Sequence, residues 1–126
     1  MKKQIEYVEK FHDAFGIKNK YNPTSQVSKD TFLLRHKLMH EENEEYLEAC
    51  RNGDLVEIAD ALGDMMYILC GTILSHGLQH RIEDIFEEIQ RSNMSKLGSD
   101  GKPIYRQDGK VMKGPNYFKP DIKKNL

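Results

Sequence analysis

The chain has 126 residues with 19 Lys or Arg and 20 Asp or Glu, so its formal net charge is −1 at pH 7. This length fits one domain, and the balanced charge argues against the basic surface typical of nucleic-acid-binding proteins. The start of the chain lacks the apolar core of a signal peptide, and the apolar run at 65–74 is shorter than the about 20 residues of a membrane span, so we expect a cytoplasmic protein that binds neither membrane nor nucleic acid.

Apolar residues at helical spacing predict four helices. The first is expected at residues 3–15, before Gly16, a usual left-handed cap. Ser28 is expected to cap a second helix that stops at residues 52–53. Asp54 and Glu57 have the spacing of a capping box for a third helix that continues to residue 75. A fourth helix is expected at 81–94, burying Ile82, Ile85, Phe86 and Ile89.

The helical period ends near residue 98. Asp108 and Gly109 then predict a short hairpin turn, and the segment GPNYFKPDI, rich in turn formers and aromatic residues, predicts an ordered flap. We therefore expect one all-α domain over residues 1–126, helical at 1–97 and with an irregular C-terminal flap at 98–126.

Charge is distributed unevenly along the chain. Residues 41–64 hold nine acids and one base, whereas residues 91–126 hold nine bases and three acids. An acidic centre followed by a basic tail favours a metal together with a polyanionic ligand.

The acids of the second and third helices lie at spacings that bring them together. A helix turns about 100° per residue, so the first group falls within roughly a 100° arc and the second within roughly 60°. The turn between the helices is short, which makes them antiparallel neighbours with facing acidic patches. The first group is Glu41, Glu42 and Glu45, and the second is Glu57, Asp60 and Asp64.

Carboxylates gathered in this way favour a divalent cation. Their hard oxygens suit Mg²⁺ or Mn²⁺, and Mg²⁺ leaves coordination positions for phosphate oxygens. Asp64 lies within the apolar run ALGDMMYIL and Asp60 directly precedes it, so we expect both to face the core, where an unpaired carboxylate is costly. Glu57 is equally well explained as the capping-box partner of Asp54.

These motifs resemble a known family. EE-x-x-E at residues 41–45, an Asp leading the apolar run in LGDMMY, and the segments RSNMSKLGSDGK and DGKVMKGPNYFKPDI are similar to the MazG-like all-α nucleoside triphosphate pyrophosphohydrolases. The likeness is to the dUTPase-like and phosphoribosyl-ATP pyrophosphohydrolase-like branches and covers about residues 30–122. It implies a bundle of four to five helices with an oligomeric core.

The resemblance also implies a set of metal ligands. Glu42, Glu45 and Asp64 would bind Mg²⁺, with Glu41 as a further ligand or as the base that orients water. The family usually has Glu three residues before that Asp, where this chain has Ala61. The fourth ligand is then Asp60, which we favour, or Glu57.

A substrate and its contacts are implied as well. The reaction would convert a nucleoside triphosphate to a nucleoside monophosphate and pyrophosphate. Asn93 and Lys96 would hold phosphate oxygens, Lys110 or Lys113 would neutralise the pyrophosphate, and Tyr117 would contact the base.

Other readings remain open. A ferritin-like di-metal protein needs two Glu-x-x-His motifs, and only Glu9 with His12 has this spacing. A catalytically silent helical interaction module would use its acids only for solubility, and a phosphoribosyl-ATP pyrophosphohydrolase would be a pathway enzyme. If the protein is an enzyme, we expect a homodimer or a dimer of dimers, because a bundle this thin buries more apolar surface when two copies associate.

Overall fold

The computed structural model describes all 126 residues and is all-α, as the sequence predicts. It divides into two compact units, Met1–His80 and Arg81–Leu126. The boundary between the two units precedes the fourth helix, because that helix packs with the C-terminal segment. The helices are α1 Lys2–Ala14, α2 Lys29–Arg51, α3 Leu55–Ser75 and α4 Ile82–Met94, followed by the short 3₁₀ helix η1 Lys123–Asn125.

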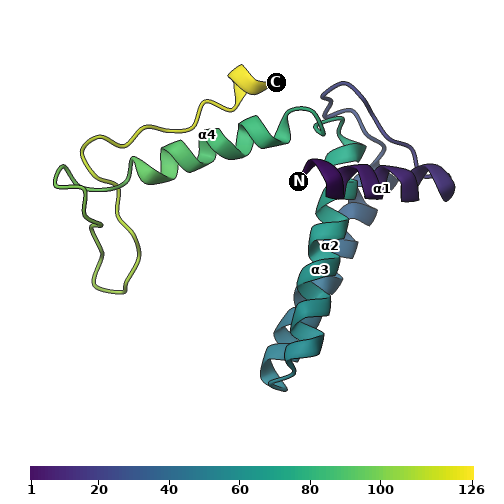
Figure 1. The fold of residues 1–126 in the computed structure, drawn as a ribbon, viewed down its shortest axis with the longest axis horizontal. Helices are drawn as coiled ribbons and strands as arrows, with labels where there is room; N and C mark the ends of the chain where they lie inside the picture. The colour runs from purple at the N-terminus through teal and green to yellow at the C-terminus, as the bar shows by residue number, and fades with distance from the viewer. The chain divides into compact units, whose positions relative to one another are not determined.

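In the first unit α2 and α3 form a long antiparallel hairpin (Figure 1). The N–H of Thr31 donates to Ser28 Oγ at 3.1 Å, which confirms the predicted cap of α2. Gly53, at φ 62°, makes the turn into α3. The N–H of Glu57 then donates to Asp54 Oδ1 at 3.2 Å. The short turn places the acidic part of α2 beside the first half of α3.

The predicted capping box is only half formed. The N–H of Asp54 donates to the carbonyl of Ala49 at 3.0 Å, so it does not need the Glu57 carboxylate that a full box would use. Glu57 is exposed. Its side chain is therefore not explained by capping.

Helix α1 packs on the second half of α3, and together they form most of the core. The buried residues there come from both helices and are Ile5, Val8, His12, Cys70, Ile73 and Leu74. The loop before α2 is tied to the end of α3, since the N–H of Lys20 donates to the carbonyl of Leu74 at 2.8 Å and that of Thr24 to His76 at 2.9 Å. These bonds satisfy carbonyls that a helix end leaves without partners.

In the second unit the C-terminal segment lies on α4. Ser92 Oγ donates to the carbonyl of Phe118 at 2.8 Å, and Lys124 Nζ lies 2.8 Å from the buried carboxylate of Glu88. An antiparallel bridge between Tyr105 and Val111 confirms the predicted hairpin turn. The flap is thus ordered, as its composition predicts.

The prediction of which α4 residues are buried is only partly right. Ile85 is buried, but Phe86 is 69% exposed and Ile89 38% exposed. The C-terminal segment covers the side of α4 that carries Ile85, Glu88 and Ser92, so it leaves the other apolar residues uncovered.

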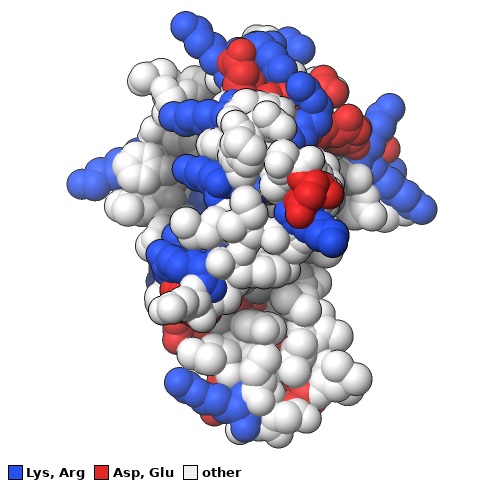
Figure 2. Space-filling model, turned by 90° about the vertical axis from the view of Figure 1, so that its left-hand side faces the viewer, with Lys and Arg blue, Asp and Glu red and all other residues white.

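Helix α3 is more apolar along its length than the run at 65–74 alone indicates. By length and composition it is able to cross a membrane, although the core helix of a soluble protein passes the same test. Its exposed apolar side carries Leu55, Leu62 and Leu69, at 76%, 47% and 44% exposure. Uncharged side chains also cover most of the lower part of the hairpin on the face shown in Figure 2.

Candidate active site

Glu42 is the centre of the acidic cluster. It lies on α2, and its Oε2 atom is buried without a hydrogen-bond partner. Burial, followed by the charges of Glu45, Asp64 and Asp60, raises the pKa of Glu42. The structure therefore brings these four predicted ligands into one electrostatic group, with contributions from both helices of the hairpin.

Asp60 and Asp64 are not buried, contrary to the prediction from the apolar run. Both are exposed, whereas Ala61 between them is 2% exposed. The reason is helical geometry: the two aspartates share the side of α3 that faces the acids of α2, and carboxylates that repel one another stay hydrated. The cost of core burial thus gives no argument for a metal here.

Two acids lie outside the group that acts on Glu42. Glu41 lies beside Lys37 on the same helix, with 4.0 Å between Nζ and Oε1, and both side chains are largely exposed. Glu57, one turn before Asp60, is not among the charges that raise the pKa of Glu42. The choice of Asp60 over Glu57 as the fourth ligand stays a prediction.

The cluster suits a hard cation by its chemistry. Its donors are all carboxylate oxygens, and one of them is buried without a partner, which is unfavourable unless a positive charge approaches. As the side chains lie here, no three His, Cys, Asp or Glu residues converge on one ion position. The acids occupy positions on α2 and α3 from which they could bind one cation, but their side chains would have to change rotamer to reach it.

Arg35 is a residue of this hairpin that the sequence analysis missed. Its Nε donates to Thr72 Oγ1 at 3.1 Å and its Nη2 to the carbonyl of Ile68 at 2.8 Å, which joins α2 to α3. It is half-buried, has no carboxylate partner, and lies seven residues before Glu42 on the same side of α2. A basic residue on the same side of the helix as Glu42, about 10 Å away along the axis, is the sequence signal that could have indicated Arg35.

The predicted phosphate and base contacts belong to the second unit. Asn93 and Lys110 are exposed, while Lys96 is half-buried and its carbonyl accepts from the N–H of Gly114 at 2.8 Å. Lys113 Nζ lies 4.8 Å from the centre of the Tyr117 ring. Backbone pairing thus brings the end of α4 beside the segment that carries Lys113 and Tyr117.

Comparison with known proteins supports this reading of the fold. A family model described as phosphoribosyl-ATP pyrophosphohydrolase matches residues 8–93. Twenty-four chains of solved structures match. One is the 1.78 Å crystal structure of a candidate NTP pyrophosphohydrolase from Exiguobacterium sp. 255-15, which is 24% identical, covers 97% of this chain and 92% of its own, and has a TM-score of 0.54. At 24% sequence identity, the similarity to this structure shows a shared fold and nothing about the activity of this chain. No curated protein matches.

Proposed function

The chain belongs to the phosphoribosyl-ATP pyrophosphohydrolase family, and from this membership we propose that it hydrolyses a ribo- or deoxyribonucleoside triphosphate between the α and β phosphates. The products are a nucleoside monophosphate and pyrophosphate. Membership supports pyrophosphohydrolase activity in general, and the substrate and the metal are our proposal.

The observation that carries the proposal is the buried, unpartnered Oε2 atom of Glu42 among three further carboxylates. Negative groups are gathered on two neighbouring helices without a positive side chain to neutralise them, which favours a cation as the missing partner. We propose Mg²⁺, with Mn²⁺ as a substitute, held by Glu42, Glu45, Asp60 and Asp64. When bound, the ion would neutralise charge on the phosphate oxygens of the substrate.

Glu41 is the residue we propose to orient the attacking water. It directly precedes Glu42 but lies outside the cluster, so its carboxylate is free to accept a proton from water held near the α-phosphorus. Its exposed pairing with Lys37, at 4.0 Å, is weak enough to be exchanged for that water. Attack breaks the α–β anhydride bond, and pyrophosphate leaves.

The second unit supplies the proposed substrate contacts. Asn93 and Lys96, at the end of α4, are proposed to bind phosphate oxygens, and Lys113 or Lys110 to neutralise the leaving pyrophosphate. Tyr117 is proposed as a further substrate contact, and its ring lies under the ammonium group of Lys113.

A second candidate substrate is phosphoribosyl-ATP, which the description of the family model favours. It carries the same triphosphate, so the acidic cluster would act in the same way. A silent interaction module is the remaining alternative, because Ala61 replaces an acid that the family usually has.

We further propose that the chain forms a homodimer or a dimer of dimers. Exposed apolar residues line the side of α3 away from the acids, and α2 exposes Phe32, Tyr46 and Leu47. Exposed apolar side chains on a small domain favour burial against a partner. A second copy seated on that side of α3 would bury its leucines without covering Asp60 and Asp64.

The test is pyrophosphate release from a panel of ribo- and deoxyribonucleoside triphosphates and phosphoribosyl-ATP, with Mg²⁺ and with EDTA. We expect Mg²⁺-dependent pyrophosphate, and no orthophosphate, from one or a few of these compounds. Absence of product from every compound would contradict the proposal and favour the interaction module.

A further inference from the structure

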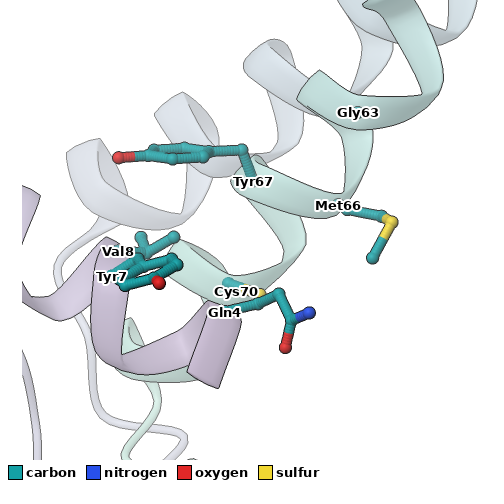
Figure 3. A pocket seen from close by; sticks show the side chains of 7 residues that line it. All are labelled: Gln4, Tyr7, Val8, Gly63, Met66, Tyr67 and Cys70. Atoms are coloured by element: carbon teal, nitrogen blue, oxygen red, sulfur yellow. The ribbon is translucent and has the colours of Figure 1, made fainter. Parts of the chain in front are cut away.

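A small cavity lies between α1 and α3, close to the acidic cluster. Its volume is about 180 Å³, and Figure 3 shows the side chains that line it from the two helices. Val8 and Cys70, at 2% and 1% exposure, form its buried floor. Tyr7 and Tyr67, at 54% and 42% exposure, stand at its more exposed rim. The cavity therefore combines an apolar floor with aromatic rings near its mouth.

The size and lining of the cavity restrict what it can hold. Pockets for drug-sized ligands measure about 300–1,000 Å³, so this one holds a single flat ring system and not a whole nucleotide. Aromatic and apolar walls favour the face of such a ring. Gln4 adds an amide that both donates and accepts hydrogen bonds, which suits the polar edge of a heterocycle.

Residues that line the cavity are close neighbours of the acidic cluster on α3. Gly63, in its wall, directly precedes Asp64, and Tyr67 follows Asp64 by three residues. On a helix, Tyr67 lies about 60° around the axis from Asp64 and about 4.5 Å along it. A ligand with phosphates at the carboxylates can thus reach the cavity along the side of α3.

Two features prepare this wall for a ligand. Phe11 makes a T-shaped contact with the Tyr67 ring, with 5.6 Å between centres, and so holds the tyrosine in place. A Cβ added at Gly63 would meet no atom within 4 Å, so the absence of a side chain leaves the wall open beside Asp64.

We propose that this cavity binds the nucleobase of the substrate. Tyr7 and Tyr67 contact the faces of the base, and the Gln4 amide reads its edge. The inference rests on the proposed function, since it takes the phosphates to lie at the acidic cluster. It assigns base selection to residues of α1 and α3 instead of to Tyr117.

Gly63→Leu tests the proposal because it adds volume without removing a contact. Leu is also a better helix former than Gly, so α3 is not weakened. Calorimetry with Mg²⁺ should compare non-hydrolysable α,β-imido nucleoside triphosphates with inorganic triphosphate, which has no base. We expect the nucleotide affinity to fall at least about tenfold, as when a base loses its stacking contacts, and the triphosphate affinity to stay unchanged.

Three further variants sharpen the result. Glu44→Leu adds the same side chain on an exposed part of α2 and should change neither affinity. Tyr7→Leu removes a ring at the rim and should again weaken only the nucleotides. Gln4→Leu should reduce the differences in affinity between bases.

The outcomes separate this inference from the proposed function. If the wild type hydrolyses nucleotides and Gly63→Leu binds their analogues equally well, the inference is wrong and the function stands. If the wild type releases no pyrophosphate but loses analogue binding on Gly63→Leu, the function is wrong and the cavity assignment stands. Binding of no nucleotide by the wild type would overturn both.

Discussion

Glu42 differs from the neighbouring glutamates in its surroundings, although its position in the sequence does not set it apart. Five glutamates occur at 41–48, and Glu42 is the one with a buried, unpartnered oxygen and a raised pKa. The spacing of the acids predicts that Glu42, Glu45 and Asp64 gather, and burial together with the charges of Glu45 and Asp64 raises the pKa of Glu42. Their role as metal ligands stays a prediction.

Asp64→Ala removes one of the charges that raise the pKa of Glu42. We expect pyrophosphate release to fall more than about 100-fold, because residues that merely support metal ligands already contribute 10–100-fold. In EDTA we expect a higher melting temperature, since repulsion between like charges is relieved. Glu45→Ala should behave in the same way, and Glu44→Ala, which removes an exposed acid, is the control. A lower melting temperature with retained turnover would instead make Asp64 a structural residue.

At the scale of elements, the helix ends follow closely from local sequence. Ser28 and Asp54 accept the hydrogen bonds expected of N-caps, and Gly16, Gly53 and Gly77 adopt positive φ after α1, α2 and α3. The surroundings of these glycines differ, however. A Cβ at Gly53 would meet nothing within 4 Å, whereas one at Gly77 would overlap the backbone of Asn22.

Gly53→Ala and Gly77→Ala therefore form a matched pair. Both place alanine at a left-handed φ, which costs about 1–2 kcal/mol. Gly77→Ala must also displace the Asn22 backbone, and overpacking adds about 1–3 kcal/mol. Urea unfolding should show the larger loss of stability for Gly77→Ala. Equal losses would mean that the loop at Asn22 moves freely.

The contact between the C-terminal segment and α4 depends on a charged group. A hydrogen bond from Lys124, followed by one from the N–H of Asp121, lowers the pKa of Glu88, and Arg91 Nη1 also donates to its carboxylate at 2.8 Å. A carboxyl whose pKa is lower in the folded state stabilises that state above its unfolded pKa, and the contribution disappears as the pH falls through the folded pKa.

We expect acidification below the ordinary glutamate range to release the C-terminal segment from α4. Amide hydrogen exchange of residues 118–124 as a function of pH would measure this release. Glu88→Gln should raise exchange at neutral pH and remove most of the pH dependence. Unchanged protection in Glu88→Gln would show that Ser92 and the apolar contacts hold the segment without the ion pairs.

At the scale of the whole molecule, much apolar surface is left uncovered. The first unit buries the second half of α3 against α1, but Leu55, Leu62 and Leu69 stay exposed on the outer side. This side lies roughly opposite Asp60 and Asp64 on the helix. A second copy seated there would bury apolar surface and leave the acids accessible.

Leu62→Glu and Leu69→Glu test this arrangement. Sedimentation equilibrium should show an oligomer for the wild type and a 14.7 kDa monomer for the double variant, because two charges would be buried in the interface. Lys10→Glu, an exposed change on α1, should leave the mass unchanged. A monomeric wild type at micromolar concentration would contradict the proposed dimer.

Sequence by itself determined the all-α class, the helix ends, the hairpin turn near Asp108 and the gathering of acids on two neighbouring helices. These features depend on contacts within one or two turns of the chain, where capping, glycine conformation and helical spacing act directly. Tertiary structure decided which faces meet. It determined that Asp60 and Asp64 are exposed and that the N–H of Asp54 donates to the carbonyl of Ala49. It also determined that α4 packs with the C-terminal segment and that a cavity lies between α1 and α3. Such outcomes depend on residues far apart in the chain, whose packing local patterns do not specify.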